Sequence, residues 1–150
     1  MSNAIIQRAN DIIAQLTIKN GAITEEFCEF CTLALIDDQG YPTASVITAS
    51  KSDGINWLAF SVGLPSNKVK RIQNCTRASV SFNSLEYCIN LVGDIEIITD
   101  AAVKEEMWYE GLEYHFPGGK SDPNYCVLKF KTKRYQIFFM DEDDEVTGTL

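Results

Sequence analysis

Residues 54–85 contain no Asp or Glu, whereas the average acid content of this chain would place between four and five acids in a stretch of that length. Pro65 and Ser66 predict the start of a short helix that ends near Gln73, with Ser66 as its cap. Free backbone N–H groups and the dipole at a helix start favour anions, and Lys68 in the first turn would add an ammonium. The stretch therefore favours a phosphate-binding corner, with a solvated basic helix face as the alternative. Its four bases are Lys68, Lys70, Arg71 and Arg77.

Five cysteines form the next candidate group, and Cys28 and Cys31 have the Cys-x-x-Cys spacing of a redox or metal motif. A redox pair of the thioredoxin type would open a helix, whereas residues 29–36 have the composition of a strand. Residues three apart on a strand point to opposite faces, so we expect no disulfide between them. No second cysteine pair completes a zinc site, and we therefore predict that the chain binds no metal.

The remaining side chains that could take part in binding or catalysis are one histidine and five aromatic residues. His115 is the single histidine, and a surface or structural role is the more common fate of a lone histidine. Five aromatic residues could stack on a planar ligand, or could belong to the core or to a dimer interface. They are Trp57, Trp108, Tyr109, Tyr114 and Phe116.

The elements that would position these residues are mostly short strands. Alternating and β-branched runs predict strands at residues 29–36, 43–50, 55–61, 77–82, 87–99, 125–131 and 134–139. Gly93 predicts a bulge or bend in the longest of them, and residues 37–40 and 51–54 predict turns. Helical spacing predicts an N-terminal helix over residues 4–18, ended by Gly21, and a later helix capped by Asp100. An irregular loop is expected over residues 111–124. These elements predict a mainly β (α+β) fold, a small antiparallel barrel with short flanking helices.

Length and charge indicate the domain organisation of the chain and exclude some functions. The 150 residues suit one domain, and the five acids of residues 141–145 indicate a solvated tail. We therefore expect a single domain over residues 1–140 and an acidic C-terminal tail over residues 141–150. With a net charge of −8, the chain lacks the excess of basic residues that is typical of nucleic-acid binders. An oligonucleotide-binding barrel is disfavoured for that reason. The absence of a signal segment or of an apolar run long enough to cross a bilayer predicts a cytoplasmic protein without a membrane partner.

Three motifs occur in a familiar order. The first is the hairpin of residues 33–42 with its Gly-x-Pro, and the second is residues 66–72 followed by Arg-Ala-Ser-Val-Ser-Phe at residues 77–82. The third joins Met-Trp at residues 107–108, Tyr-His-Phe-Pro-Gly-Gly at residues 114–119 and the segment 122–130. Through these motifs the chain resembles the pyridoxamine 5′-phosphate oxidase-like FMN-binding split barrels, particularly the branch called general stress protein 26. The resemblance covers about residues 5–140.

This resemblance implies an antiparallel split barrel that pairs as a homodimer, with FMN in the cleft between subunits. The family's flavin contacts fall on the second strand, the third strand, the helix start and one position where the oxidases carry Gln. In this sequence they are Ser45, Val46, Ile47 and Thr48, then Ser61 and Val62, then Ser66, Asn67 and Lys68, and finally Cys88.

The sequence departs from the oxidases at Ser45 and Asn67, where they carry arginines that contact the phosphate, and Lys68 is the cation that remains. Each lost charge-assisted bond would cost about 1.5–3 kcal/mol. The oxidases' substrate-phosphate residues near the C-terminus have no counterpart, so pyridoxamine phosphate oxidation is not expected. The resemblance implies a flavoprotein, binding FMN or another flavin such as FAD, that oxidises or reduces an unidentified small molecule. The alternative is a non-catalytic ligand-binding or stress-associated module that has lost tight flavin binding.

Overall fold

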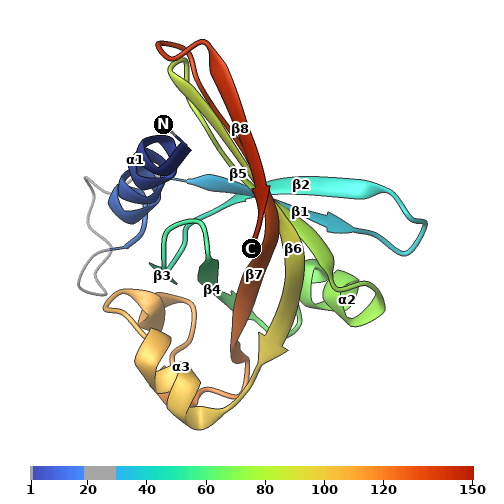
Figure 1. Ribbon diagram of the computed structural model, residues 1–150. Coiled ribbons are helices and arrows are strands. Elements are labelled where there is room, and N and C mark those ends of the chain that lie inside the picture. The colour runs from blue at the N-terminus through green and yellow to red at the C-terminus, as the bar shows by residue number, and fades with distance from the viewer. Residues whose placement is uncertain (1, 19–29) are drawn as a thin grey trace.

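The computed structural model describes residues 2–18 and 30–150. Its main feature is one eight-stranded antiparallel sheet with the strand order β2-β1-β5-β6-β7-β4-β3, to which β8 adds by pairing with β7 (Figure 1). The mainly β, antiparallel architecture predicted from the sequence is confirmed. The strands are β1 (Cys31–Ile36), β2 (Pro42–Ile47), β3 (Lys51–Ser52), β4 (Trp57–Gly63), β5 (Arg77–Asn83), β6 (Tyr87–Ile98), β7 (Tyr125–Phe139) and β8 (Asp144–Thr149).

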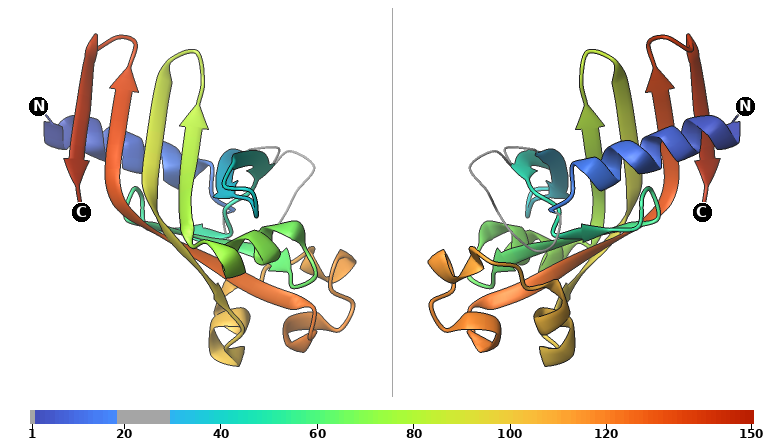
Figure 2. Two further views of the ribbon diagram at one scale, coloured as in Figure 1. Left: turned by 90° about the vertical axis from the view of Figure 1, so that its right-hand side faces the viewer. Right: turned by 90° about the vertical axis from the view of Figure 1, so that its left-hand side faces the viewer.

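Strand β7 divides the barrel because its two halves have different neighbours. It pairs with β6 over nearly its whole length, while residues 125–131 also pair with β4 and residues 134–139 also pair with β8. Figure 2 shows β7 curving from one end of the molecule to the other between these partners. The curvature coincides with a register shift between Val92 and Gly93, which confirms the bulge predicted at Gly93. A Cβ at Gly93 would overlap the backbone carbonyl of Lys131, so no larger residue fits there.

The helices lie on the outside of this sheet. They are α1 (Ser2–Gln15), α2 (Asn67–Asn74), α3 (Ala101–Met107) and the 3-10 turns η1 (Leu112–Tyr114) and η2 (Gly119–Ser121). Helix α1 crosses the strands on one face and buries Ile5, Ala9 and Ile13 in the core (Figure 2). Within residues 2–18 and 30–150, no helix combines the length and the apolar character that a bilayer crossing requires.

Two apolar clusters fill the interior. The larger one occupies the barrel, where alternate residues of β1 and β5 point inward, and it includes Val69 and Ile72 of α2. The smaller one lies between β4, the start of β7 and the segment that follows α3. This second cluster places the aromatic residues after α3 against the sheet. Its buried members are Ile18, Ala59, Met107, Tyr109, Leu112, Phe116, Tyr125 and Val127.

The structure differs from the sequence prediction mainly near the C-terminus. The two strands expected at residues 125–131 and 134–139 are one strand, and the expected acidic tail carries β8. Residues 141–143 form an exposed turn with a positive φ at Asp143, after which Val146, Thr147 and Thr149 extend along the free edge of β7. Backbone pairing at a strand edge tolerates the acids that the turn leaves in solvent.

Smaller differences concern loops. The loop expected at residues 111–124 contains η1 and η2, and residues 51–52, expected in a turn, pair with β4 as β3. Helix α1 ends at Gln15, and the predicted stop at Gly21 lies outside the described residues. Cys28 also lies outside them.

Candidate functional site

A cavity of about 460 Å³ opens beside the ends of β2 and β4, within the usual size range of small-molecule sites. We call it the β2–β4 cavity. It contains four of the flavin contacts predicted from the sequence, and the rest of its lining is Gly63 of β4 and four residues of the segment after α3. The lining residues are Ile47, Thr48, Ser61, Val62, Gly63, Tyr109, Leu112, His115 and Phe116.

The walls of this cavity combine apolar surface with hydroxyl groups. Ile47 and Val62 on the sheet side lie across from Leu112 and Phe116, and Thr48, Ser61 and Tyr109 add polar atoms. Among the described residues, no Asp, Glu, Lys or Arg belongs to this lining. Apolar walls with a few placed hydroxyl groups suit an uncharged planar heterocycle.

Ser61 is held in place by buried neighbours. Its hydroxyl lies 3.0 Å from the hydroxyl of Ser50, which is itself buried. Burial raises the pKa of the nearby Tyr125 phenol, and the Ser61 hydroxyl lowers it again in part. The phenol of Tyr125 donates to the backbone carbonyl of Lys104 at 2.9 Å. The orientation of Ser61 is therefore set before any ligand enters.

Tyr109 contributes the second notable hydroxyl. Its side chain is only 8% exposed, and burial, with Tyr125 as the second cause, raises its pKa to about 12. The phenol thus stays protonated at neutral pH and can donate a hydrogen bond. Among the described residues it has no hydrogen-bond partner, so the donor is available to a ligand. The sequence marked Tyr109 only as an aromatic residue that could stack, because nothing in the sequence shows whether a hydroxyl has a partner.

The other aromatic candidates divide between the two roles left open by the sequence. Phe116 lines the cavity, whereas Trp108 packs edge-on against Tyr125 with the ring centroids 5.3 Å apart. Tyr114 is 87% exposed and lies outside the cavity lining. His115, expected to have a surface or structural role, is exposed but lines the cavity.

The predicted helix start at Ser66 is confirmed. Ser66 has extended backbone angles, and its hydroxyl accepts from the backbone N–H of Val69 at 3.4 Å, so it caps α2. Lys68 is half-buried in the first turn of the helix. Neither residue lines the β2–β4 cavity, so a ligand that used both features would have to extend beyond it.

In the folded chain, part of the acid-free stretch of residues 54–85 lies beside two aspartates of the β1–β2 turn. A second cavity, of about 380 Å³, lies between the β1–β2 turn and α2, and we call it the turn hollow. Two of the four bases, Lys70 and Arg71, therefore line the same cavity as the turn acids, whereas Lys68 does not line it. The lining residues of the turn hollow are Asp37, Asp38, Asn67, Lys70, Arg71 and Asn74.

Residues 23–139 match the family model described as pyridoxamine 5′-phosphate oxidase. The chain belongs to the pyridoxamine 5′-phosphate oxidase family. No curated protein matches the chain in sequence. Solved structures of low identity share its split-barrel fold, which confirms the fold expected from the resemblance.

Three of these structures are informative. The first is a Clostridium acetobutylicum protein related to general stress protein 26 of B. subtilis, with 22% identity and a TM-score of 0.71, covering 99% of this chain and 92% of its own. The second is a pyridoxamine 5′-phosphate oxidase-related, FMN-binding protein from Nostoc punctiforme, with 14% identity and a TM-score of 0.58, covering 99% and 95%. The third is a heme-binding protein from Mycobacterium smegmatis, with 16% identity and a TM-score of 0.68, covering 97% and 57%.

In this member of the pyridoxamine 5′-phosphate oxidase family, three predicted contacts lie away from both the cavity and the start of α2. Ser45 and Val46 are exposed on β2, Val46 by 66%. Cys88 lies on β6, paired with Asn83 of β5 and Phe138 of β7, and Asn90 donates to its sulfur at 3.4 Å. A single chain of this family member therefore brings together only part of the predicted site.

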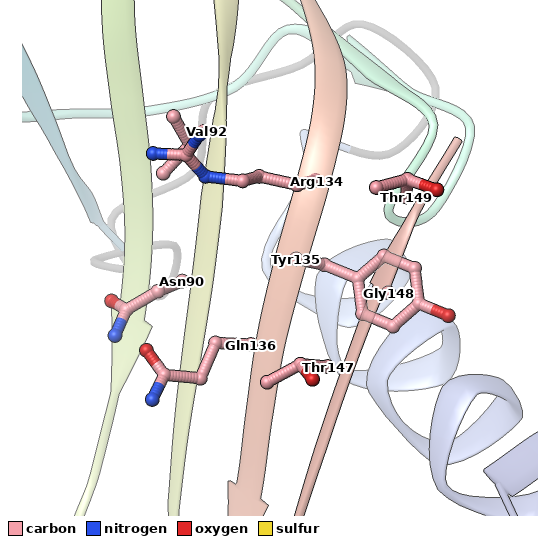
Figure 3. Close-up of a pocket in the computed structure, with 8 residues that line it drawn as sticks. All are labelled: Asn90, Val92, Arg134, Tyr135, Gln136, Thr147, Gly148 and Thr149. Carbon is pink, nitrogen blue, oxygen red and sulfur yellow. The ribbon is translucent and has the colours of Figure 1, made fainter.

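A further groove, of about 530 Å³, crosses β6, β7 and β8 on the sheet of this family member. Figure 3 shows Arg134 extending from β7 toward Val92 of β6, and the ring of Tyr135 reaching β8 at Gly148. A Cβ at Gly148 would overlap the Tyr135 hydroxyl, so the glycine makes room for that ring. The groove was not predicted from the sequence, because the acids of residues 141–145 indicate a tail and not a strand. The β-branched residues at 146, 147 and 149 were the available signal for β8.

Proposed function

We propose that this protein binds FMN in the β2–β4 cavity and acts as a flavin-dependent oxidoreductase on a small molecule. One observation carries the proposal: four positions expected to contact the flavin line a single cavity together with Tyr109, whose hydroxyl has no hydrogen-bond partner among residues 2–18 and 30–150. The FMN-binding neighbour from Nostoc punctiforme supports the choice of ligand. When bound, FMN would supply electron and hydride transfer, which the protein's own side chains cannot.

The residues present fit such a group. Ile47 and Val62 offer apolar surface to a ring, and Ser61 and Tyr109 offer hydrogen bonds to its heteroatoms. The phosphate would lie at the capped start of α2 beside Lys68, outside the cavity. The chain's contribution would be to bind and orient the cofactor and to exclude water, while the cofactor supplies the redox chemistry.

We further propose that the protein is a homodimer in which the partner completes the flavin site. Cys88, the position of the oxidases' ring-contacting Gln, does not line the β2–β4 cavity of its own chain. Val46 is exposed next to Ile47 of the cavity lining, and Tyr41 is exposed in the β1–β2 turn at the other end of β2. Exposed apolar groups of this size commonly mark an interface. A second chain would cover them and bring its own Cys88 toward the ligand.

The rival proposal is a non-catalytic module that uses the same cavity for another ligand. It is favoured by the loss of two phosphate-binding arginines, at Ser45 and Asn67, and by the exposure of both positions. The heme-binding neighbour shows that the fold accepts more than one prosthetic group. His115 is the lining residue that heme iron would bind.

The deciding experiment is the visible spectrum of concentrated purified protein, followed by titration with FMN, riboflavin and heme. We expect FMN to bind with one molecule per chain and to bind more tightly than riboflavin, which lacks the phosphate. Binding of neither flavin would favour the rival. Binding of heme in preference to both would assign the cavity to heme instead.

A further inference from the structure

The Phe-Pro-Gly-Gly segment and the residues after it are tied down by one carboxylate. Asp122 is only 7% exposed, and its two carboxylate oxygens accept from the backbone N–H groups of Gly118 and Asn124, both at 2.9 Å. These two bonds lower the pKa of Asp122. The carboxylate is therefore a fixed bridge between the two ends of the segment.

Lys104 of α3 also binds Asp122, at its backbone carbonyl. It is also 7% exposed, and its ammonium donates to the backbone carbonyl of Asp122 at 2.9 Å. The same ammonium lies 5.2 Å from the ring centroid of Tyr125, whose phenol donates back to the carbonyl of Lys104. A buried charge is retained only where it is well paired, so these contacts are specific. We call Lys104 and Asp122, with the bonds described here, the clasp.

The two glycines of the segment are the residues that the clasp requires. A Cβ at Gly118 would lie 3.0 Å from the Asp122 carboxylate, so a larger residue there would push the carboxylate away by a few tenths of an ångström. Gly119 has a φ of +74°, which favours glycine even though the space around it is open. The two glycines of the Phe-Pro-Gly-Gly pattern thus suit the backbone around Asp122.

Two sets of contacts connect the clasp to the β2–β4 cavity and to the start of α2. Phe116, two residues before Gly118, packs on Tyr125 with the ring centroids 5.1 Å apart and forms part of the cavity wall. On the other side, the carbonyl of Asn124 accepts from the N–H of Leu64 at 2.7 Å, two residues before the cap of α2. One carboxylate therefore links the ring wall to the helix start where the phosphate is proposed to bind.

We propose that Lys104 and Asp122 are positioning residues for the β2–β4 cavity, holding the Phe116 wall and the approach to α2 in the geometry that binds a ligand. Neither residue lines the cavity, so they act on a ligand only through the segments they hold. The inference uses the proposed function only for its probe, a flavin. The local ordering of residues 112–124 is independent of it.

The test compares Asp122→Asn, Lys104→Met and Gly118→Ala with a matched control, Glu105→Gln. Glu105 is the neighbour of Lys104 on α3 and makes only an exposed ion pair with Lys120 at 3.8 Å. Two quantities are measured where circular dichroism shows every variant folded. They are the affinity for FMN and for riboflavin, and the amide hydrogen exchange of residues 112–124 relative to β6.

We expect the three clasp variants to bind both flavins about tenfold more weakly, with faster exchange confined to residues 112–124. The control should match wild type in both. Gly118→Ala keeps both charges, so it tests the geometry if a charge variant fails to fold. Unchanged affinity in a folded clasp variant would overturn the inference, and so would exchange that rises equally in β6.

If wild type binds no flavin, the proposed function fails, and exchange alone then decides the inference. Faster exchange confined to residues 112–124 would support the clasp. Unchanged or uniformly faster exchange would overturn it.

Discussion

Lys68 and Lys70 lie two residues apart on α2 but have different surroundings. Lys70 lines the turn hollow together with Asp37 and Asp38, whereas Lys68 does not and is half-buried in the first turn. Two residues on a helix are about 200° apart around its axis. The proposed phosphate contact therefore belongs to Lys68, because Lys70 shares its space with carboxylates.

Lys68→Ala should weaken FMN binding by about tenfold, since it removes a charge-assisted contact to the phosphate. Riboflavin has no phosphate, so its affinity should not change. Lys70→Ala is the matched control and should alter FMN affinity much less. Fluorescence titration of all three proteins measures these effects. An equal loss of FMN and riboflavin affinity in Lys68→Ala would make Lys68 a structural residue.

Tyr109→Phe should produce the complementary result. It removes a donor that has no partner among the described residues, so thermal stability should stay the same while both flavins bind less tightly, by about 1 kcal/mol. Tyr125→Phe is the contrasting variant, because its phenol donates to the buried carbonyl of Lys104 and its loss should lower the melting temperature. Calorimetry and flavin titration separate the two. Unchanged flavin affinity in Tyr109→Phe would remove its hydroxyl from the site.

The stability conferred by Asp122 should depend on pH. Hydrogen bonds from the backbone N–H groups of Asn124 and Gly118 hold the folded-state pKa of Asp122 below its ordinary value. The stabilisation is therefore complete above the unfolded pKa, near 4, and is lost as the pH falls through the lower folded value. Urea unfolding of wild type and Asp122→Asn should show a difference in stability that is constant near neutrality and shrinks in acid. A difference independent of pH would contradict this assignment.

The cysteines should differ in reactivity. Burial raises the pKa of Cys31 to about 12 and that of Cys126 to about 11, so neither forms much of the reactive thiolate in the folded protein. Cys75 and Cys88 are only half-buried. Iodoacetamide followed by peptide mass spectrometry should label these two first and the buried pair only after unfolding. Thiol titration of denatured protein prepared without reductant should find all five thiols, and three would indicate a disulfide.

The proposed dimer predicts a mass of about twice 16.8 kDa in light scattering at micromolar concentration. It also predicts that FMN slows alkylation of Cys88 but not of Cys75, because only Cys88 would approach the ligand of the partner chain. A monomer, or equal protection of both thiols, would contradict the composite site.

Local signals in the sequence predicted the parts of this fold that depend on neighbouring residues. Ser66 and Asp100 each cap the helix that follows, as expected, because a cap bonds to N–H groups two or three residues away. Gly93 lies at the bulge, because the backbone carbonyl of Lys131 comes so close there that a Cβ would not fit. The resemblance carried by the motifs then led to the correct family, and four of the contacts that it implies, Ile47, Thr48, Ser61 and Val62, line one cavity.

Other features were decided only by contacts between distant segments. Asp37 and Asp38 lie beside α2 because β1 and β2 turn there, which no composition window could show. Tyr109 and His115 join Ser61 in one cavity because the segment after α3 folds back on β4 and β7. Strand β8 forms because β7 offers a free edge, and whether that edge is open depends on the rest of the sheet and not on residues 144–149 themselves. The sequence alone thus determined the local elements and the family, while the tertiary structure decided which charges, hydroxyl groups and edges meet.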